Sequence, residues 1–277
     1  MEECNMDARI KKCTEWAQQI RNMIVDLTMG VGKKGVHVGS ALSVADVMAV
    51  LYGDVMKYDP QNGEAENRDY FVLSKGHAYT ALYATLCKAG YFTYEDLAAN
   101  FMADNGFAPV HPVKNLQKGI EFSGGSLGTG VSFAVGKAYG LKLQDKSNKV
   151  YTLLGDGECN EGSVWEALMS AAHLKLDNLT VIIDNNALQQ DGPTGEVMNL
   201  DIFKAAESFG LEVKVIDGNN VTELLEVFNT QGTEGKPRCI IAKTIKGKGV
   251  SFMENNNAWH HAFLNQKQYD QAKEELK

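Results

Sequence analysis

Hydrophobic residues recur every three or four positions near the start of the chain, whereas later they gather in short runs. Between residues 6 and 28 the apolar side chains fall at helical spacing and glycines follow, so we predict one long amphipathic helix. A second helix should begin at Ser43, because Ser43 and Asp46 form a capping-box pattern ahead of an apolar stretch. These segments predict a helical extension over residues 1–60.

From residue 149 onward, short β-rich runs alternate with helical stretches. We predict strands over residues 150–154, 179–184, 211–216 and 239–243, with helices over residues 163–175, 202–209 and 221–228. This alternation, with strands apolar on both faces, predicts an α/β fold in which a parallel sheet is flanked by helices. Ligands of such sheets bind at the carboxyl ends of the strands.

Two long connections, residues 104–126 and 245–265, are rich in Gly, Asn and His. Ordered loops of this length usually carry function. With no internal repeat or linker-like tract, the sequence predicts a single domain over residues 1–277 that ends in a loop and a helix at 245–277.

Composition and charge limit the kinds of partner that the chain can bind. The chain is 44% hydrophobic and 22% charged, as is usual for a globular protein, and its net charge of −8 argues against nucleic acid or an anionic membrane as a partner. Its polar start and the lack of a long apolar run lead us to expect a cytoplasmic protein. The five cysteines form no CxxC pair, so we expect reduced thiols.

Polar residues follow two of the predicted strands. One strand ends in GDG around Asp156, and the next ends about thirty residues later in NN at Asn186. A crossover of that length returns the chain to the same edge of the sheet, so Asp156 and Asn186 should face each other there. Each motif alone is a common turn or strand end. Together they offer a carboxylate and an amide oxygen to a hard cation, beside glycines that let a phosphate approach.

Four of the six histidines, His37, His77, His111 and His260, lie in loops beside Gly, Pro or a second His. Imidazoles that titrate near neutrality can exchange protons with sugar hydroxyls, as C–C bond cleavage next to an alcohol requires. A lone loop histidine is usually a surface residue, but this set favours an active site. We expect a structural role for His173, which falls on a predicted helix.

The GDG and NN spacing resembles the thiamine diphosphate signature of decarboxylases, 2-oxoacid dehydrogenases and ketol transferases. The segments GVHVGS, LSKGHAYTALY, GGSLGTG, GDGECNEGSVWEA, LDNLTVIIDNN and KTIKGKG with WHH resemble successive blocks of the transketolase N-terminal domain. The resemblance implies the thiamine-diphosphate-binding fold, diphosphate type, and transfer of a two-carbon ketol unit from a ketose phosphate to an aldose phosphate. The alternatives are a 1-deoxyxylulose-5-phosphate synthase, a 2-oxoacid dehydrogenase α subunit, or a non-catalytic cofactor-binding subunit.

The resemblance also assigns site residues. It implies a Mg²⁺ ion, or Ca²⁺ or Mn²⁺, held by Asp156, Asn186 and the Leu188 carbonyl. Catalytic positions would be His37, His77, His111, His260 and Glu161, although the helix dipole alone could explain Glu161. Cofactor contacts would come from Ser40, His77, Gly125, Ser126, Leu127, Asp156, Gly157, Asn186, Gln190, Lys243 and His260, where the alignment around Gln190 and Lys243 permits a shift.

This sequence departs from the family pattern at two loop positions. His261 replaces the usual glycine after the last histidine, which leaves open whether His260 or His261 faces the substrate, and Val38 replaces the usual proline after His37.

The glutamate that activates the cofactor in this family belongs to a second α/β domain, and the chain carries no second strand–helix series. The resemblance therefore implies the N-terminal subunit of a split transketolase. A separate C-terminal, pyrimidine-binding subunit would complete the active site in an α2β2 heterotetramer that acts on sugar phosphates.

Overall fold

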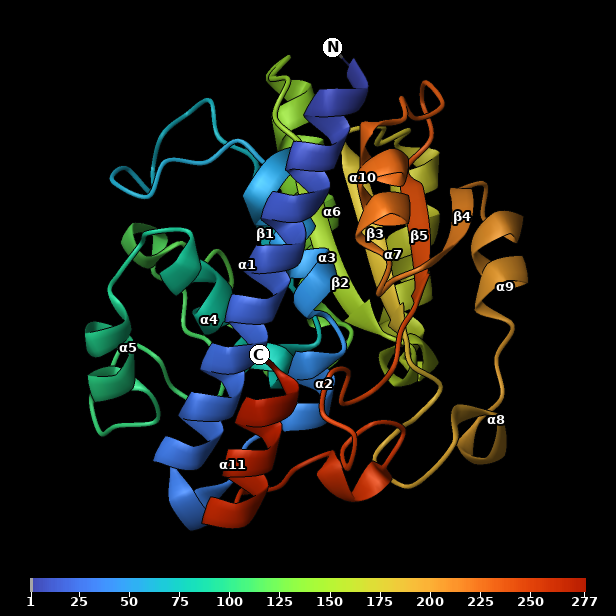
Figure 1. The fold of residues 1–277 in the computed structure, drawn as a ribbon. Coiled ribbons are helices and arrows are strands. Elements are labelled where there is room, and N and C mark those ends of the chain that lie inside the picture. Colours follow the sequence, from blue (N-terminus) through green and yellow to red (C-terminus); the bar gives the residue numbers. More distant parts are fainter. Residues whose placement is uncertain (1) are drawn as a thin grey trace.

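The computed structural model describes the backbone of residues 2–277 and the side chains from residue 6 onward. Five parallel strands form one sheet in the order β1-β2-β3-β5-β4 (Figure 1). The strands are β1 (Tyr70–Leu73), β2 (Val150–Gly155), β3 (Leu179–Asn185), β4 (Glu212–Asp217) and β5 (Arg238–Lys243). The predicted α/β fold with a helix-flanked parallel sheet is confirmed.

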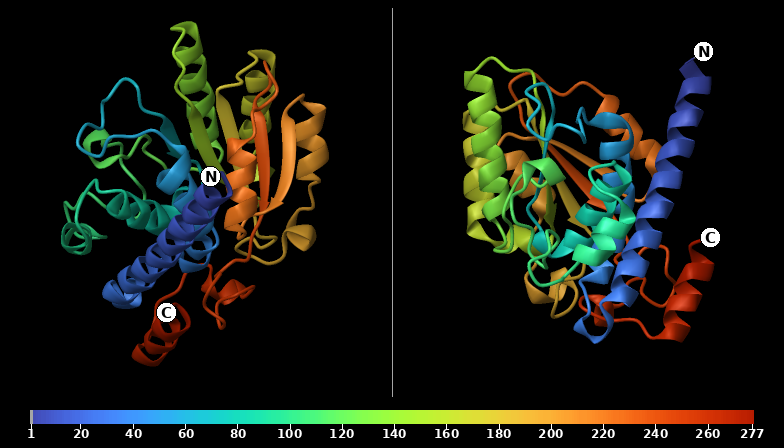
Figure 2. Two further views of the ribbon diagram at one scale, coloured as in Figure 1. Left: turned by 45° about the horizontal axis from the view of Figure 1, so that its top comes forward. Right: turned by 90° about the vertical axis from the view of Figure 1, so that its left-hand side faces the viewer.

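Helices cover both faces of the sheet, with α1, α3 and α10 on one side and α6, α7 and α9 on the other (Figure 2). The α-helices are α1 (Glu2–Gly30), α2 (Val38–Leu42), α3 (Ala45–Val50), α4 (Tyr79–Lys88), α5 (Tyr94–Asn100), α6 (Thr129–Leu143), α7 (Gly162–His173), α8 (Thr194–Val197), α9 (Ile202–Ser208), α10 (Val221–Asn229) and α11 (Gln266–Glu275). Shorter 3-10 or π-helical turns lie at Gly32–Lys34, Leu51–Val55, Gly76–Ala78, Leu116–Lys118, Gly157–Asn160 and Asn257–Trp259.

Alternating residues of each strand feed two separate cores. In β1, Phe71 and Leu73 join the core beneath α1, whereas Tyr70 and Val72 join the core beneath α6. The long helix α1 buries one face, including Ile20 and Ile24, against the first of these cores. It therefore belongs to a layer that covers the sheet, as its apolar spacing requires.

The predicted strands and helices of the second half match the observed ones to within two residues at either end. The prediction of a capping box at Ser43 is wrong. Helix α3 begins at Ala45 without a side-chain cap, because the Ser43 hydroxyl donates to buried Asp184 instead (2.8 Å) and Asp46 forms a buried ion pair with Arg21. A capping hydroxyl must lie over the first helix amides to accept from them, and the bond to Asp184 directs the Ser43 side chain elsewhere.

No helix of the described residues is long and apolar enough to cross a membrane. Cys13, Cys87, Cys159 and Cys239 are free thiols, as expected, and Cys4 lies outside the residues whose side chains are described.

Candidate functional site

A cavity of about 310 Å³ opens at the carboxyl ends of the central strands, where the parallel topology predicts a ligand site. Strand ends, the start of the 3-10 turn after β2 and the two long loops all contribute to it. Its lining consists of His37, Ser40, Lys75, His77, His111, Gly125, Leu127, Gly155, Asp156, Gly157, Glu158, Asn186, Leu188, Gln189, Gln190, Lys246 and His260.

Asp156 and Asn186 follow neighbouring strands, as the sequence predicts. Each lies one residue beyond its strand, β2 for Asp156 and β3 for Asn186. The Asp156 carboxylate accepts hydrogen bonds from the backbone amides of Gly157 (2.8 Å) and Ala187 (2.6 Å). The second bond ties the two strand ends together across the edge of the sheet.

The backbone after Asn186 is shaped by a residue in the left-handed region. Ala187 has φ 62°, a conformation that costs energy for any residue with a Cβ. The Asn186 amide nitrogen donates to Asp184 at 3.0 Å, and its oxygen accepts the Leu188 amide at 3.1 Å. The structure thus brings the three expected metal ligands, Asp156, Asn186 and the Leu188 backbone, to one cavity.

These donors fit a hard divalent cation, because all of them are oxygens. Burial and the neighbouring charge of Asp184 raise the pKa of Asp156 to about 6. A cation beside the Asp156 carboxylate would offset both effects. Two polar atoms of the lining, Ser40 Oγ and His37 Nδ1, are buried without a hydrogen-bond partner among the described residues, so a polar cofactor could satisfy them.

Asp184, near the end of β3 and two residues before Asn186, is fully buried. It makes a buried ion pair with Lys75 and accepts further hydrogen bonds from Ser43 (2.8 Å), Thr244 and Asn186 (3.0 Å). Burial would raise the pKa of Asp184, but the Lys75 ammonium and these donors lower it overall. Asp184 is therefore a charged anchor that joins β3 to three other segments.

Glu158 is a second buried carboxylate that joins separate segments, here at the start of α6. The N-cap of α6 is Gly128, which has no side chain, and Glu158 accepts hydrogen bonds from the Gly128 amide (2.9 Å), the Gly155 amide (3.1 Å) and the Ser74 hydroxyl (2.5 Å). Ser74 in turn accepts the Val131 amide at 3.1 Å. Residues from other segments thus satisfy the first amides of α6, which helix geometry leaves open. Burial raises the pKa of Glu158.

Three of the expected histidines form a triangle of rings. The ring centroids of His37, His77 and His260 lie 5.3–5.7 Å apart. Burial and the neighbouring imidazoles lower the pKa of His37 to about 3, and burial with the charge of Lys75 lowers the pKa of His77 as well. His111 also lines the cavity but is exposed, and a Cβ on Gly125 would meet its ring at 3.4 Å. At neutral pH, His37 and His77 are therefore neutral bases.

Lys246 holds His260 in place. Its ammonium lies 2.9 Å from His260 Nδ1 and 3.2 Å from the Leu188 carbonyl. Burial and the charge of Lys75 lower the pKa of Lys246 to about 8, and burial with Lys246 lowers that of His260 to about 4. His260 lines the cavity, whereas His261 is exposed and contacts the ring of His37 instead.

The structure does not bring three sequence-predicted residues into this cavity. Ser126 is exposed, between Gly125 and Leu127, which do line it. Glu161 is exposed and starts α7 as its N-cap, without a side-chain cap bond. Lys243 ends β5 and lines a second cavity instead, whereas Lys246, three residues on, lines this one. The permitted alignment shift explains the difference.

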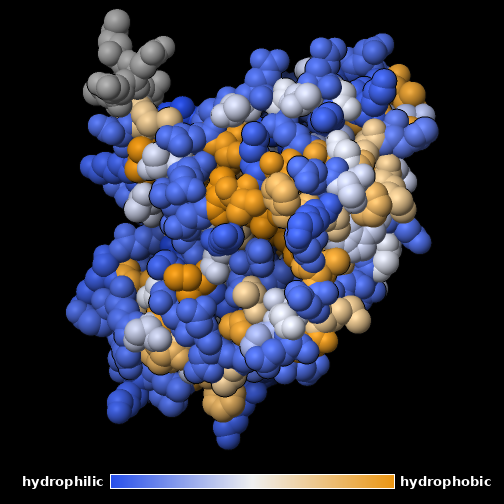
Figure 3. All heavy atoms as spheres, turned by 90° about the vertical axis from the view of Figure 1, so that its right-hand side faces the viewer, coloured by the Kyte–Doolittle hydropathy of each residue, from blue (hydrophilic) through white to orange (hydrophobic). Residues whose placement is uncertain are grey.

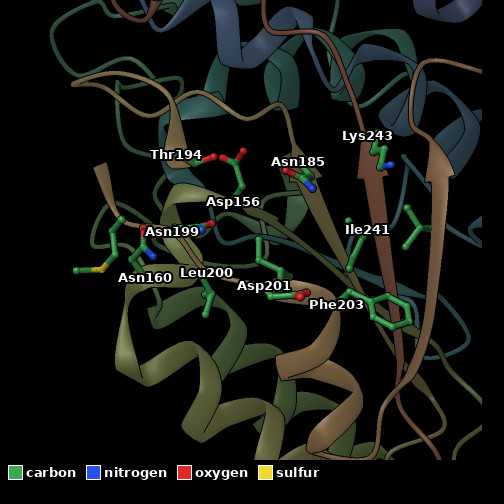
Figure 4. Close-up of a pocket in the computed structure, with 13 residues that line it drawn as sticks. Asp156, Asn160, Asn185, Thr194, Asn199, Leu200, Asp201, Phe203, Ile241 and Lys243 are labelled. Atoms are coloured by element: carbon green, nitrogen blue, oxygen red, sulfur yellow. The ribbon is translucent and has the colours of Figure 1, made fainter. Parts of the chain in front are cut away.

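The second cavity, of about 300 Å³, lies on the other side of Asp156 (Figure 4). Lys243 and Asn185 come from strand ends there, whereas Asn199, Leu200 and Phe203 come from the segment before and in α9. The same side of the molecule carries exposed apolar side chains among hydrophilic ones (Figure 3). Those between the start of α8 and the end of β4 are Val197, Met198, Leu200, Phe203 and Val215.

Sequence reasoning missed five lining or anchoring residues, namely Lys75, Glu158, Asp184, Gln189 and Lys246. The signal was present for some of them, since charged residues inside apolar or glycine-rich segments are buried only with a partner. Lys75 stands in LSKGH and Asp184 directly precedes NN. Only the fold shows that they pair with each other.

The chain matches the family model described as "Transketolase, thiamine diphosphate binding domain" over residues 13–277. It is 38% identical to one subunit of the apulose-4-phosphate transketolase of Actinobacillus succinogenes, over 94% of each chain. It is 41% identical to a 6-deoxy-6-sulfo-D-fructose transketolase subunit of a Clostridium strain, over 94% of this chain and 95% of that one.

Longer transketolases also match. Human transketolase is 37% identical over 97% of this chain but only 42% of its own length. The solved structure of the Leishmania mexicana transketolase superposes with a TM-score of 0.88 at 30% identity, over 95% of this chain and 41% of that one. The chain thus spans less than half of these two proteins. All four relatives are transketolases, so a deoxyxylulose phosphate synthase or 2-oxoacid dehydrogenase subunit is not favoured. A family match over residues 13–277, with relatives this similar, makes the chain a member of the transketolase family through its thiamine diphosphate-binding domain.

Proposed function

We propose that the chain is the N-terminal subunit of a split transketolase, which moves a two-carbon ketol unit between sugar phosphates together with a separate subunit. The observation that carries this proposal is one cavity at the strand ends that combines the Asp156, Asn186 and Leu188 oxygens with four loop histidines. Relatives of this length are named as transketolase subunits, which supports a two-chain enzyme.

Asp156, Asn186 and the Leu188 carbonyl would hold Mg²⁺, or Ca²⁺ or Mn²⁺, against the diphosphate of the cofactor. Gly125 and Gly157 would leave room for that diphosphate beside Leu127, and Lys246 would add positive charge; a Cβ on Gly157 would already meet Gln189 at 3.0 Å. Thiamine diphosphate, when bound, supplies the nucleophilic carbon and the electron sink for C–C cleavage.

Ketol transfer requires that one proton leave a donor hydroxyl and that another return to an aldehyde oxygen. His37 and His77 suit the first task, because burial keeps both rings neutral and able to accept a proton. His111 faces them from the Gly125 loop and would hold hydroxyls of the substrate.

His260 suits the second task. Below pH 8 the Lys246 ammonium donates to His260 Nδ1, so the neutral ring carries its proton on Nε2. As that proton moves to a substrate oxygen, the Lys246 ammonium would give its own proton to Nδ1, so the ring would stay neutral. Lys246 therefore sets the tautomer of His260 as well as its position.

The outer face of α6 and α7 supports a partner subunit. Helix α6 buries Val131 and Ala138 against the sheet, yet its opposite side exposes Phe133 (37%) and Leu143 (67%). Between these two, a Cβ at Gly136 would find no atom within 4 Å, which is room for the close approach of another helix. A helix that is apolar on both sides is typically covered on both sides.

A partner on this face would meet the cavity, because Gly125 and Leu127, just ahead of α6, line it. Exposed Glu161 at the start of α7 would then lie near the subunit boundary, where it would couple the two active sites of an α2β2 heterotetramer. We assign the phosphate end of the sugar to the partner, and the enzyme to the cytoplasm.

Reconstitution tests this function. The chain is mixed with a candidate pyrimidine-binding subunit, and ketol transfer from a ketose phosphate to an aldose phosphate is measured with thiamine diphosphate and Mg²⁺. We expect activity from the mixture and none from either chain alone. Full activity of this chain alone would rule out a split site, and a mixture that uses pyruvate but no ketose phosphate would revive the alternative enzymes.

A further inference from the structure

His261 stands where two loops of the cavity wall are joined by backbone pairing. Val36 and Ala262 form an antiparallel bridge with hydrogen bonds of 2.9 and 3.0 Å. In an antiparallel pair, the residue after one member lies opposite the residue before the other, so His37 faces His261. Their ring centroids are 4.7 Å apart, at 76°.

The approach of these two loops depends on a glycine. Gly35 has φ 68°, and a Cβ there would lie 2.9 Å from the Ala262 carbonyl oxygen and 3.1 Å from the His261 ring. Contacts under 3.0 Å force atoms apart, so only glycine allows the imidazole of His261 to lie against this strand. The position of His261 is therefore built into the local backbone.

His77, His37 and His261 form a row of three rings, of which the first two line the cavity and the third is exposed. His77 and His37 line the cavity with 5.5 Å between their centroids, and His261 lies beyond His37 in solvent. A sugar whose reacting carbons lie between His37 and His77 must extend its remaining hydroxyls outward.

We propose that His261 is a specificity-determining residue, which binds hydroxyl groups of the sugar chain beyond the transferred ketol unit at the mouth of the cavity. The imidazole can both donate and accept a hydrogen bond with such hydroxyls. Its edge-on contact with His37 fixes the ring there, so little conformational entropy is lost on binding. This inference rests on the transketolase function proposed above.

The test compares two donors in the reconstituted two-subunit enzyme. One is a ketose phosphate, and the other is hydroxypyruvate, which carries the ketol unit and no sugar chain and releases carbon dioxide on transfer. His261→Gly should raise the KM for the ketose phosphate about five- to tenfold, the effect of losing one or two hydrogen bonds, and should change kcat less than about twofold. The KM for hydroxypyruvate should stay the same.

Two further variants separate binding from loop structure. His261→Asn keeps a donor and an acceptor and should restore much of the lost affinity. Phe263→Gly, two residues along the same loop and 48% exposed, should leave both KM values unchanged. An unchanged ketose KM in His261→Gly, or an equal loss with both donors, would overturn the proposal. Absence of transfer by the wild-type complex with either donor would overturn the proposed function instead.

Discussion

The polar side chains on two sides of the cavity differ in whether they have hydrogen-bond partners within the chain. On one side, which we call the closed wall, the lining residues Lys75 and Glu158, with Asp184 behind them, are almost fully buried, and each hydrogen-bonds to other segments of the chain. On the other, which we call the open side, Ser40 Oγ and His37 Nδ1 have no partner among the described residues.

The difference indicates which polar groups stabilise the fold and which are left to bind a ligand. Buried charge that the protein itself satisfies fixes the strand ends and the start of α6, but has no capacity left for a ligand. Polar atoms left open, and the raised pKa of Asp156, make the open side ready for a cation or a polar cofactor. Two aspartates at adjacent strand ends, Asp184 and Asp156, thus have opposite roles.

The same substitution at these two aspartates gives the largest expected contrast. Asp184→Asn leaves the Lys75 ammonium buried beside a neutral amide, and should lower the free energy of unfolding by about 3–5 kcal/mol in urea titrations. Asp156→Asn removes a charge that burial and Asp184 already disfavour, so it should change stability by less than about 1 kcal/mol.

Binding should follow the reverse order. Asp156→Asn should abolish most of the Mg²⁺-dependent binding of thiamine diphosphate to the proposed two-subunit complex, measured by calorimetry with and without chelator, because the proposed metal site would lose its one charged ligand. Equal losses of stability in the two variants would mean that Asp156 belongs to the closed wall. Undiminished metal-dependent binding in Asp156→Asn would remove it from the metal site.

A smaller effect is expected at Glu158. Glu158→Gln replaces one acceptor oxygen by an amide group that faces the Gly155 or Gly128 amide, and should lower the free energy of unfolding by about 1–3 kcal/mol. The matched control is Glu161→Gln, three residues later and exposed, which should change it by less than about 0.5 kcal/mol. Equal effects in urea unfolding would mean that the Glu158 contacts do not stabilise the start of α6.

The same contrast explains what the sequence could predict. Asp156 and Asn186 were recognisable because turn residues follow apolar strands at a spacing that one crossover explains. Asp184 and Lys75 were not, because their pairing joins residues 109 positions apart and leaves no periodic trace. The sequence predicted Lys243 as the lysine of this cavity, whereas Lys246 lines it. The glycine-rich segment that contains Lys246 allows the alignment to shift. Strand β1 was missed because four apolar residues stand alone ahead of the alternating region.

The smallest expected effect lies on the open side and depends on pH. The folded state keeps His37 neutral, with a pKa of about 3, whereas the unfolded chain takes up a proton near pH 6.5. Stability from this group is complete above pH 6.5 and declines as pH falls toward 3, since the unfolded state then binds more protons. The charged or titratable groups that surround it are His77, Tyr79, His111, His260, His261 and Lys246.

A single histidine of this kind lowers the free energy of unfolding by at most about 2 kcal/mol as the pH falls from 7 to 5. For His37 we expect a loss of about 1 kcal/mol, because its side chain is only half-buried. His37→Asn should therefore flatten urea-unfolding stability against pH by that amount, whereas His173→Asn, on the exposed end of α7, should leave the slope as it is. An unchanged slope in His37→Asn would mean that the open side, like the closed wall, satisfies its own polar groups.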